Sequence, residues 1–293
     1  MILHYHIHEV SEYIHWIYFF HAWGFQPRYA SIADIHGCDA CRAMWLARFP
    51  EEERAKASEA MQLYKEAQRM LSHLHKTYQT HAIFRLMEAN SIGNDIWMEG
   101  TRFPLLRQQS ARQGEPYLCL SDFIRPASSG ITDKIGLFAT SVDSGMESMY
   151  KDDAYKHMLV QTLADRLAEA TSEKLHEHIR KEVWGFAPDE HLTIKQMHNE
   201  EFQGIRPAVG YPSLPDQSIN FLLDDLLDMK QIGITLTENG MMQPHASVSG
   251  MIFAHPASRY FSVGKIDETQ LEDYARRRNL PLETMKKYLS SNL

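Results

Sequence analysis

The chain has 293 residues, of which 44% are hydrophobic and 23% are charged, and its formal net charge at pH 7 is -8. This composition is typical of a globular protein with a sizeable core, and the acidic balance argues against binding to nucleic acids or to an anionic membrane surface. No apolar run approaches the roughly 20 residues that a membrane span requires. The N-terminus carries no basic segment or cleavage site of a secretory signal, so we expect a cytoplasmic protein.

The first ten residues alternate between apolar side chains and histidines, which predicts a strand. His4, His6 and His8 would then lie on one face of that strand, an arrangement that can bind a metal ion. A solvated edge strand explains the same pattern, and we favour that interpretation.

The three cysteines, Cys38, Cys41 and Cys119, do not suggest a disulfide framework, because their number is odd. Cys38 and Cys41 make a single CxxC motif just after His36. A structural zinc site usually needs a fourth ligand, and a redox CxxC usually belongs to a thioredoxin-like βαβ unit, which we do not find here. We therefore interpret the motif as a chance occurrence and predict no metal site.

Helical and strand patterns are mixed along the rest of the chain. Residues 11–25 contain seven aromatic side chains and are expected to lie in the core. Apolar residues at helical spacing predict long helices over residues 50–78 and 151–184 and shorter ones over residues 193–202, 220–232, 267–279 and 282–289. Strands are predicted within residues 81–98, 117–123, 135–141, 233–239, 247–253 and 260–266.

This order of elements predicts an α+β fold with a mainly antiparallel, twisted sheet and long flanking helices. The sequence contains no linker and no repeat. We therefore expect residues 1–293 to form a single domain that folds without a metal or cofactor.

A proline-rich loop over residues 206–215, with the sequence RPAVGYPSLP, separates two helical segments. Three prolines and a glycine in ten residues exclude a helix or a central strand. Gly210 permits a positive φ or a close backbone approach. From the loop alone, a rigid turn and a ligand-binding loop are equally good interpretations.

Other motifs in the C-terminal half decide between these interpretations. They read ADRLAEA at residues 164–170, WGFAP at 184–188, QGI before Arg206, ASVSG at 246–250, HPASRYFSVGKI at 255–266 and EDYARR at 272–277. In this order and spacing, they resemble the C-terminal activation domain of cobalamin-dependent methionine synthase from about Asp152 onward. Weaker matches at residues 13–20, 88–90, 106–109 and 117–123 extend the resemblance to nearly the whole chain.

The resemblance implies a site for S-adenosylmethionine (AdoMet). An arginine suits the carboxylate of this ligand, and acidic side chains suit its ammonium and sulfonium groups. The adenine would need backbone groups and an aromatic wall. The residues that match the family's site are Arg206, Ala208, Gly210, Tyr211, Glu169, Glu200, Tyr260 and Phe261. Spacing alone would assign Glu169 to a solvated acidic face with Asp165 and Glu173, at i, i+4 intervals.

His15 occupies the position of an aspartate that lies in the family's AdoMet site. A protonated histidine would repel a ligand with two positive groups. If His15 lies in the site, AdoMet should bind more weakly as the pH falls through about 6.5. A second departure from the family lies at residues 84–88, where FRLME stands in place of the glycine-rich segment that leads to the family's Ala-Asn pair.

The resemblance also implies the reaction. In the family, cobalamin that has oxidised to an inactive state is restored by an electron from a flavodoxin-type donor and a methyl group from AdoMet. Tyr211 matches the tyrosine that faces the corrin. Because the sequence lacks homocysteine, folate and cobalamin modules, we expect it to act on cobalamin held by a separate methionine synthase or corrinoid protein. We do not expect methyltransferase activity from this chain alone.

Two other functions are compatible with the sequence. The chain could be a docking module for a corrinoid protein, with a degenerate AdoMet site and no methyl transfer, as His15 and residues 84–88 would suggest. It could also bind a metal through the N-terminal histidines or through Cys38 and Cys41. AdoMet affinity distinguishes the first alternative, and a metal assay tests the second.

Overall fold

The protein is built around one six-stranded antiparallel sheet, and the computed structural model describes all 293 residues. The strands lie in the order β4-β3-β2-β5-β8, and β1 pairs with the part of β2 that β3 leaves free. Their bounds are β1 Ile2–His6, β2 Gln79–Ile92, β3 Asp95–Met98, β4 Thr101–Pro104, β5 Asp133–Val142 and β8 Ser247–Ile252. A separate hairpin joins β6 Thr235–Leu236 to β7 Met242–Gln243. The predicted α+β class is confirmed.

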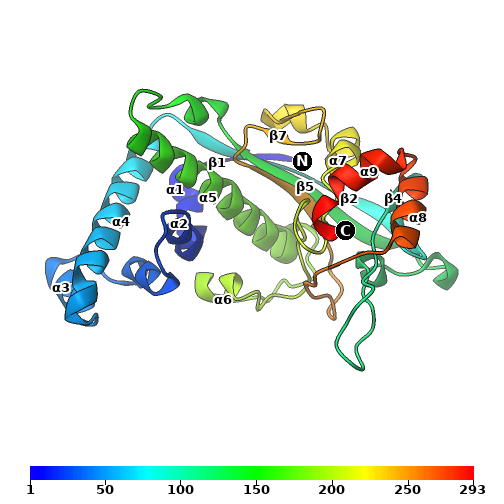
Figure 1. The fold of residues 1–293 in the computed structure, drawn as a ribbon, viewed down its shortest axis with the longest axis horizontal. Helices are drawn as coiled ribbons and strands as arrows, with labels where there is room; N and C mark the ends of the chain where they lie inside the picture. The colour runs from blue at the N-terminus through cyan, green and yellow to red at the C-terminus, as the bar shows by residue number, and fades with distance from the viewer.

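Nine α-helices surround the sheet. In Figure 1, α5 lies between α3 and α4 at one end of the molecule and α8 and α9 at the other. Their bounds are α1 Ile7–Val10, α2 Trp16–Ala22, α3 Asp39–Ala47, α4 Arg54–Leu74, α5 Ala154–His178, α6 Ile194–His198, α7 Ile219–Leu227, α8 Glu268–Arg278 and α9 Leu282–Tyr288. None of these helices combines the length and the hydropathy needed to cross a membrane.

The alternation of side chains along the strands creates a core on each face of the sheet. In β2, Ala82 and Phe84 belong to the core that includes α4 and α5, whereas Ile83 and Met87 belong to the core that includes α7. Because both faces are covered, most of β5 is buried. A third, smaller core joins α8 and α9.

Polar contacts fix α5 against the sheet. The hydroxyl of Thr140 in β5 donates to the carbonyl of Ala168 at 3.0 Å and lies 2.8 Å from the hydroxyl of Ser172. Ala164 and Ala168 are small and almost fully buried, so the helix can lie close to the strand. This packing fixes the orientation of α5 and therefore the direction in which the acidic side chains of the helix point.

The proline-rich loop begins as an extended segment beside the outer edge of β8. Isolated bridges pair Ile205 with Phe253 and Ala208 with Gly250. A β-carbon at position 250 would collide with the carbonyl oxygen of Pro207. Glycine is therefore required where the loop crosses the strand, and this contact holds the loop over the sheet.

Several predicted elements have different bounds. The first strand ends at His6, because the Glu9 carboxylate accepts the His6 backbone N–H and starts a helical turn over Ile7–Val10. The prediction that His8 shares a strand face with His4 is therefore wrong. The helix predicted over residues 193–202 ends at His198, since Glu200 adopts a left-handed backbone with φ of 58°.

Two predicted strands are wrong. Residues 117–123 contain a 3-10 turn over Leu120–Phe123 instead, because the Asp122 carboxylate caps it by accepting the Cys119 N–H. Residues 260–266 are irregular, and the Val263 N–H donates to the loop carbonyl of Pro212. The strand predicted over residues 233–239 is only two residues long.

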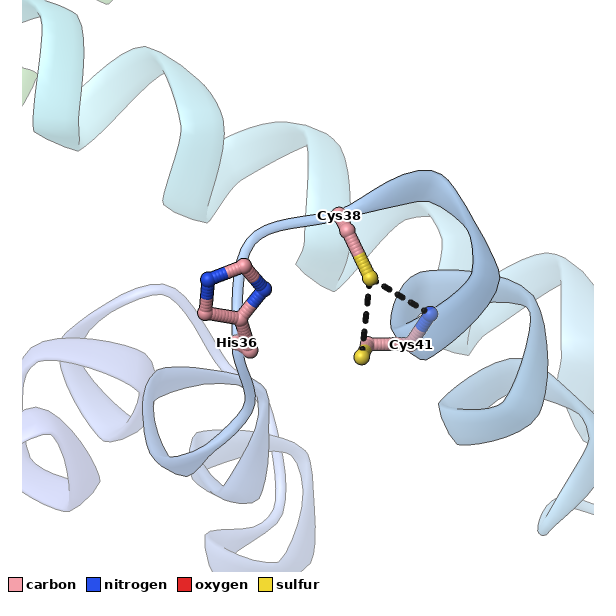
Figure 2. Close-up of side chains that lie close together, drawn as sticks. All are labelled: His36, Cys38 and Cys41. Carbon is pink, nitrogen blue, oxygen red and sulfur yellow. Dashed lines mark hydrogen bonds between the residues drawn. The ribbon is translucent and has the colours of Figure 1, made fainter.

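The remaining helices and strands were predicted with errors mainly at their ends. The helix predicted over residues 50–78 is α4, and the one over residues 151–184 is α5, followed by a π turn at Ile179–Val183. Sequence patterns did not indicate β4, α2 or α3. Helix α3 begins at the CxxC motif, where the Cys38 sulfur accepts the backbone N–H of Cys41 (Figure 2).

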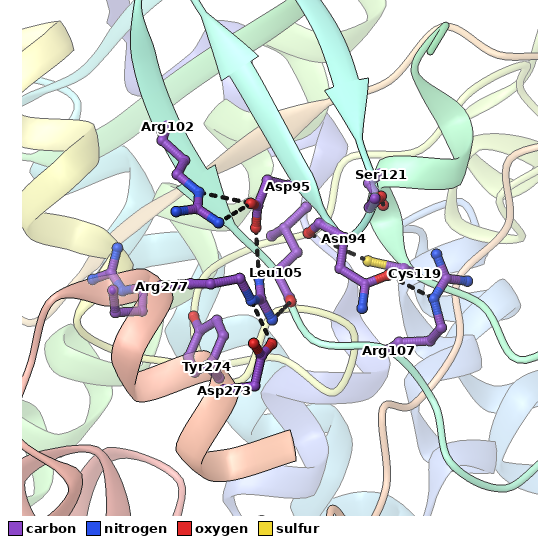
Figure 3. A network of polar contacts seen from close by, with 12 residues as sticks. Asn94, Asp95, Arg102, Leu105, Arg107, Cys119, Ser121, Asp273, Tyr274 and Arg277 are labelled. Atoms are coloured by element: carbon purple, nitrogen blue, oxygen red, sulfur yellow. Dashed lines mark hydrogen bonds and ion pairs between the residues drawn. The ribbon is translucent and has the colours of Figure 1, made fainter. Parts of the chain in front are cut away.

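Ion pairs attach the C-terminal helices to the sheet (Figure 3). Asp95 in β3 accepts hydrogen bonds from Arg102 in β4 at 2.6 Å and from Arg277 in α8 at 2.5 Å. Arg277 also binds Asp273 and the carbonyl of Leu105. Because the Asp95 and Arg277 side chains are both 7% exposed, removal of either partner would leave a buried charge.

We propose that residues 1–293 unfold as one cooperative domain, because the two main cores share every central strand and the C-terminal helices are attached by buried charges. Thermal unfolding should give coincident transitions by far-ultraviolet circular dichroism and by tryptophan fluorescence. Limited proteolysis that released two independently stable fragments would contradict this prediction.

Candidate functional site

A cavity of about 810 Å³ lies between α5, the proline-rich loop and the N-terminal segment around α2. Its size suits a small ligand. Side chains that are far apart in the sequence line it. They come from residues 15–22, from 166–173 in α5, from 197–202 at the end of α6 and just after it, from the loop at 206–213, and from Val248 and residues 260–262.

Eight of the nine residues predicted for the site line this one cavity: His15, Glu169, Glu200, Arg206, Ala208, Tyr211, Tyr260 and Phe261. Gly210 does not line it. Its φ is 87° and its N–H donates to the carbonyl of Leu214 at 2.8 Å, so it shapes the turn that positions Tyr211. Residues 84–88, the second departure from the family, lie within β2, away from the cavity lining.

Arg206 forms the central polar contact of the cavity. Its guanidinium donates to the carbonyl of Ser172 at 2.7 Å and to Glu173 at 2.5 Å, and the side chain is 12% exposed. Burial opposes the charge, but the ion pair with Glu173 outweighs it and raises the pKa of Arg206. A guanidinium has five N–H donors, so donors remain for a ligand carboxylate.

Glu173 is a site residue that the sequence analysis missed. One of its carboxylate oxygens binds Arg206, and the other is buried without a hydrogen-bond partner. Such an oxygen is costly to leave unpaired, and it can accept from a cationic ligand group. The spacing of four residues from Glu169 was the signal, since it places both carboxylates on one side of the helix.

Glu169 lies one helical turn earlier, near the mouth of the cavity. Its carboxylate pairs with Arg166 at 2.8 Å and lies 3.5 Å from the hydroxyl of Tyr211. Burial raises the pKa of Glu169, although Arg166 partly offsets this. Tyr211 and Tyr18 also line the cavity, yet they are 53% and 55% exposed. Two tyrosines therefore form an exposed aromatic rim.

Glu200 completes a group of three carboxylates. The residue is exposed overall, but partial burial at the cavity and repulsion from Glu173 raise its pKa. The raised pKa values of Glu169 and Glu200 share one largest cause, the partial burial of the carboxylates, and repulsion from Asp165 and from Glu173, respectively, adds to it. A cationic ligand would relieve this repulsion.

Aromatic side chains cover the cavity beside Arg206. The hydroxyl of Tyr260 accepts the backbone N–H of Arg206 at 2.9 Å, and burial raises the pKa of Tyr260, which keeps the hydroxyl protonated. Phe261 and Phe202 also line the cavity. Phe202 packs edge-on against His176, whose ring centroid lies 4.9 Å away. These rings provide an apolar wall for a planar group.

His15 precedes α2 and lies in the cavity, stacked on His198 with ring centroids 4.3 Å apart. Burial and the neighbouring His198 lower the pKa of His15 to about 4. The change of charge that an unshifted histidine would show near about pH 6.5 therefore moves to a lower pH. His15 is neutral at pH 7 and neither repels a cation nor replaces the negative charge of an aspartate.

The N-terminal histidines do not form one cluster. The Nδ1 atoms of His4 and His81 are 2.8 Å apart, and His81 also contacts Asp143. His8 lies beside His75 instead, with their Nδ1 atoms 3.4 Å apart. The His6 ring also lies beside His8 and His75, with ring centroids 5.8 Å from each, so His4 and His81 form a separate pair.

Comparisons with known proteins cover nearly the whole chain. A family model described as "Vitamin B12 dependent methionine synthase, activation domain" matches residues 6–279. Among solved structures, the chain is similar to one described as the crystal structure of the MetH reactivation domain bound to AdoHcy (S-adenosylhomocysteine), with 35% sequence identity and a TM-score of 0.88. That similarity covers 100% of this chain and 90% of the other. Both matches include every segment that lines the cavity.

The lowered pKa of His15 can be measured by NMR. Its ring resonances should not shift between about pH 8 and about pH 6, and they should titrate near pH 4. Because His15 takes up its proton at a lower pH in the folded state than in the unfolded state, stability should fall as the pH drops from about 6.5 to about 4. His15→Gln should be less sensitive to acid in that window. A His15 midpoint near about 6.5 would contradict the buried, stacked position.

Proposed function

Because the chain belongs to the family of vitamin B12-dependent methionine synthase activation domains, we propose that it binds AdoMet in the 810 Å³ cavity and supports the reductive methylation of cobalamin. One observation carries the assignment of the site. A buried arginine with spare donors lies beside three carboxylates and an aromatic wall in a single cavity. These groups match the carboxylate, the two cationic groups and the adenine of AdoMet.

Each lining group has a distinct role in this proposal. Arg206 binds the ligand carboxylate, and the unpartnered oxygen of Glu173 accepts from the ammonium group. Glu169 and Glu200 provide negative charge for the sulfonium. The backbone from Ala208 to Tyr211 and the rings of Tyr260 and Phe261 hold the adenine. His15 fills space at the edge of the cavity as a neutral ring.

AdoMet supplies a methyl group to reduced cobalamin, a strong nucleophile that needs no general base from this chain. The contribution of the protein is to hold the ligand in a fixed orientation, which can accelerate a transfer strongly. Tyr211 and Tyr18 lie at the exposed mouth of the cavity, where they can contact a corrin presented from outside.

The partners follow from the family. Methionine synthase carries its cobalamin on a cobalamin-binding module, which we propose as the partner of this cavity. A flavodoxin-type protein is the proposed electron donor. A cytoplasmic location belongs to the same proposal, and three free cysteines suit a reducing compartment.

The alternative, a docking module with a degenerate AdoMet site, was suggested by His15. A neutral His15 removes the repulsion on which that argument depended. The loss of the family's aspartate still weakens attraction for a cation, so affinity for AdoMet remains the deciding measurement.

Replacement of Arg206 by alanine should weaken AdoMet binding at least about 30-fold, because a buried charge-assisted contact contributes about 2 kcal/mol or more. Isothermal titration of the purified chain measures this directly. Arg206→Lys should give an intermediate affinity, since lysine keeps the positive charge but lacks the planar guanidinium that binds a carboxylate through two N–H groups.

Two controls make this experiment decisive. Arg85→Ala removes an exposed arginine from its ion pair with Glu99, outside the cavity, and should bind as the parent does. Melting temperatures of all variants separate loss of affinity from loss of fold. Tight AdoMet binding by a folded Arg206→Ala variant would remove Arg206 from the site, and no binding by the parent would favour the docking module.

The pH dependence of binding should follow the carboxylates. Glu169 and Glu200 have raised pKa values, so they take up protons at a higher pH than ordinary glutamates and before His15 does. AdoMet affinity should therefore fall in acid, and the fall should begin at a higher pH than the titration of ordinary glutamates would give.

Glu169→Gln should reduce the affinity at neutral pH by about 1 kcal/mol and make the acid decrease shallower. Glu59→Gln, an exposed change on α4, is the matched control and should alter neither. An acid decrease that Glu169→Gln left unchanged would point to another titrating group instead.

A further inference from the structure

The CxxC motif forms a compact group at the start of α3, outside the AdoMet cavity. The sulfurs of Cys38 and Cys41 are 2.9 Å apart, and the His36 ring lies beside them (Figure 2). Ligand atoms of the three side chains all lie within 4.8 Å of one another. Because a disulfide bond is about 2.05 Å long, the sulfurs need to approach by less than about 1 Å to form one. Neither cysteine is fully buried, so reagents can reach them.

The two thiols have different environments. Hydrogen bonds from Cys41 and His36 lower the pKa of Cys38 to about 7, and the bond to Cys38 raises the pKa of Cys41. Cys38 is also the N-cap of a nine-residue helix, where the backbone N–H of Cys41 donates to its sulfur at 3.3 Å. An accessible thiolate next to a second thiol is the usual arrangement of an attacking and a resolving cysteine.

From this arrangement we propose that Cys38 and Cys41 are a thiol–disulfide exchange site for small anionic disulfides. The Cys38 thiolate attacks one sulfur of the disulfide, which forms a mixed disulfide and releases one thiolate. Cys41 then loses its proton to solvent and attacks the Cys38 sulfur, which releases the second thiolate. The chain is oxidised by two electrons, and the small disulfide is reduced to two thiols.

The anionic preference comes from a neighbouring cavity of about 320 Å³. Gly37, between His36 and Cys38, forms part of its wall, and the Arg42 guanidinium, which is paired with Asp39 at 3.2 Å, lies close over that glycine. Lys65 and Arg69 of α4 also line the cavity, together with apolar side chains and without any acidic one. A disulfide that carries carboxylates, such as glutathione disulfide, fits this charge.

The same three side chains could instead bind a thiophilic cation such as Zn²⁺, with a water as the fourth ligand. The 2.9 Å contact between two partly exposed sulfurs favours exchange. A metal site is therefore the competing outcome of the test.

The test treats the reduced, full-length chain with glutathione disulfide and follows the products by mass spectrometry. The parent should form a Cys38–Cys41 disulfide that dithiothreitol reverses. Cys41→Ser should accumulate a glutathione adduct at Cys38, and Cys38→Ser should react at least about tenfold more slowly. Cys119→Ser is the matched control and should react as the parent does, because Cys119 is fully buried.

A second arm tests the preference of the basic cavity for an anionic disulfide. Lys65→Gln and Arg69→Gln should slow the reaction with glutathione disulfide by about threefold or more and leave the rate with neutral hydroxyethyl disulfide unchanged. Equal effects on both reagents would overturn the anionic preference. Equal rates for the parent and Cys38→Ser would overturn the exchange site. Retention by the purified chain of one Zn²⁺ that protects both thiols would identify a metal site instead.

Discussion

The candidate site depends on the ion pair between Arg206 and Glu173. It joins the proline-rich loop to α5, two segments that are separately attached to the sheet. Gly250 lets the loop lie against β8, and Thr140 fixes α5 against β5. The ion pair therefore links the loop and α5 at the edge of the sheet, and the cavity lies beside this contact.

The balance of charge around Arg206 explains why the cavity suits a cationic ligand. Three carboxylates face two arginines, and Arg206 is already committed to Glu173. The cavity therefore holds an excess of negative charge, and partial burial of the carboxylates is the largest cause of the raised pKa values of Glu169 and Glu200. A ligand with an ammonium and a sulfonium group would neutralise this excess, whereas its carboxylate would use the remaining donors of Arg206.

Contacts far from the cavity hold its walls in place. The hydroxyl of Tyr274 in α8 donates to Asp216 at 2.7 Å, just after the proline-rich loop, and Arg278 donates to Ser218. These contacts from α8 thus help to hold the end of the proline-rich loop in place. At the opposite end of the molecule, α3 carries the paired thiols on a part of the fold that the AdoMet cavity does not use (Figure 1).

The sequence by itself determined the long amphipathic helices, most central strands and the proline-rich loop, because local periodicity and turn residues encode them. The resemblance carried by a set of rare motifs added eight residues of the cavity. Only the tertiary structure decided which helical turn brings Glu173 to Arg206, and that His15 is neutral because it is buried against His198. It also replaced two predicted strands by a 3-10 turn and an irregular segment. These outcomes depend on burial and on partners distant in the sequence, which local pattern does not specify.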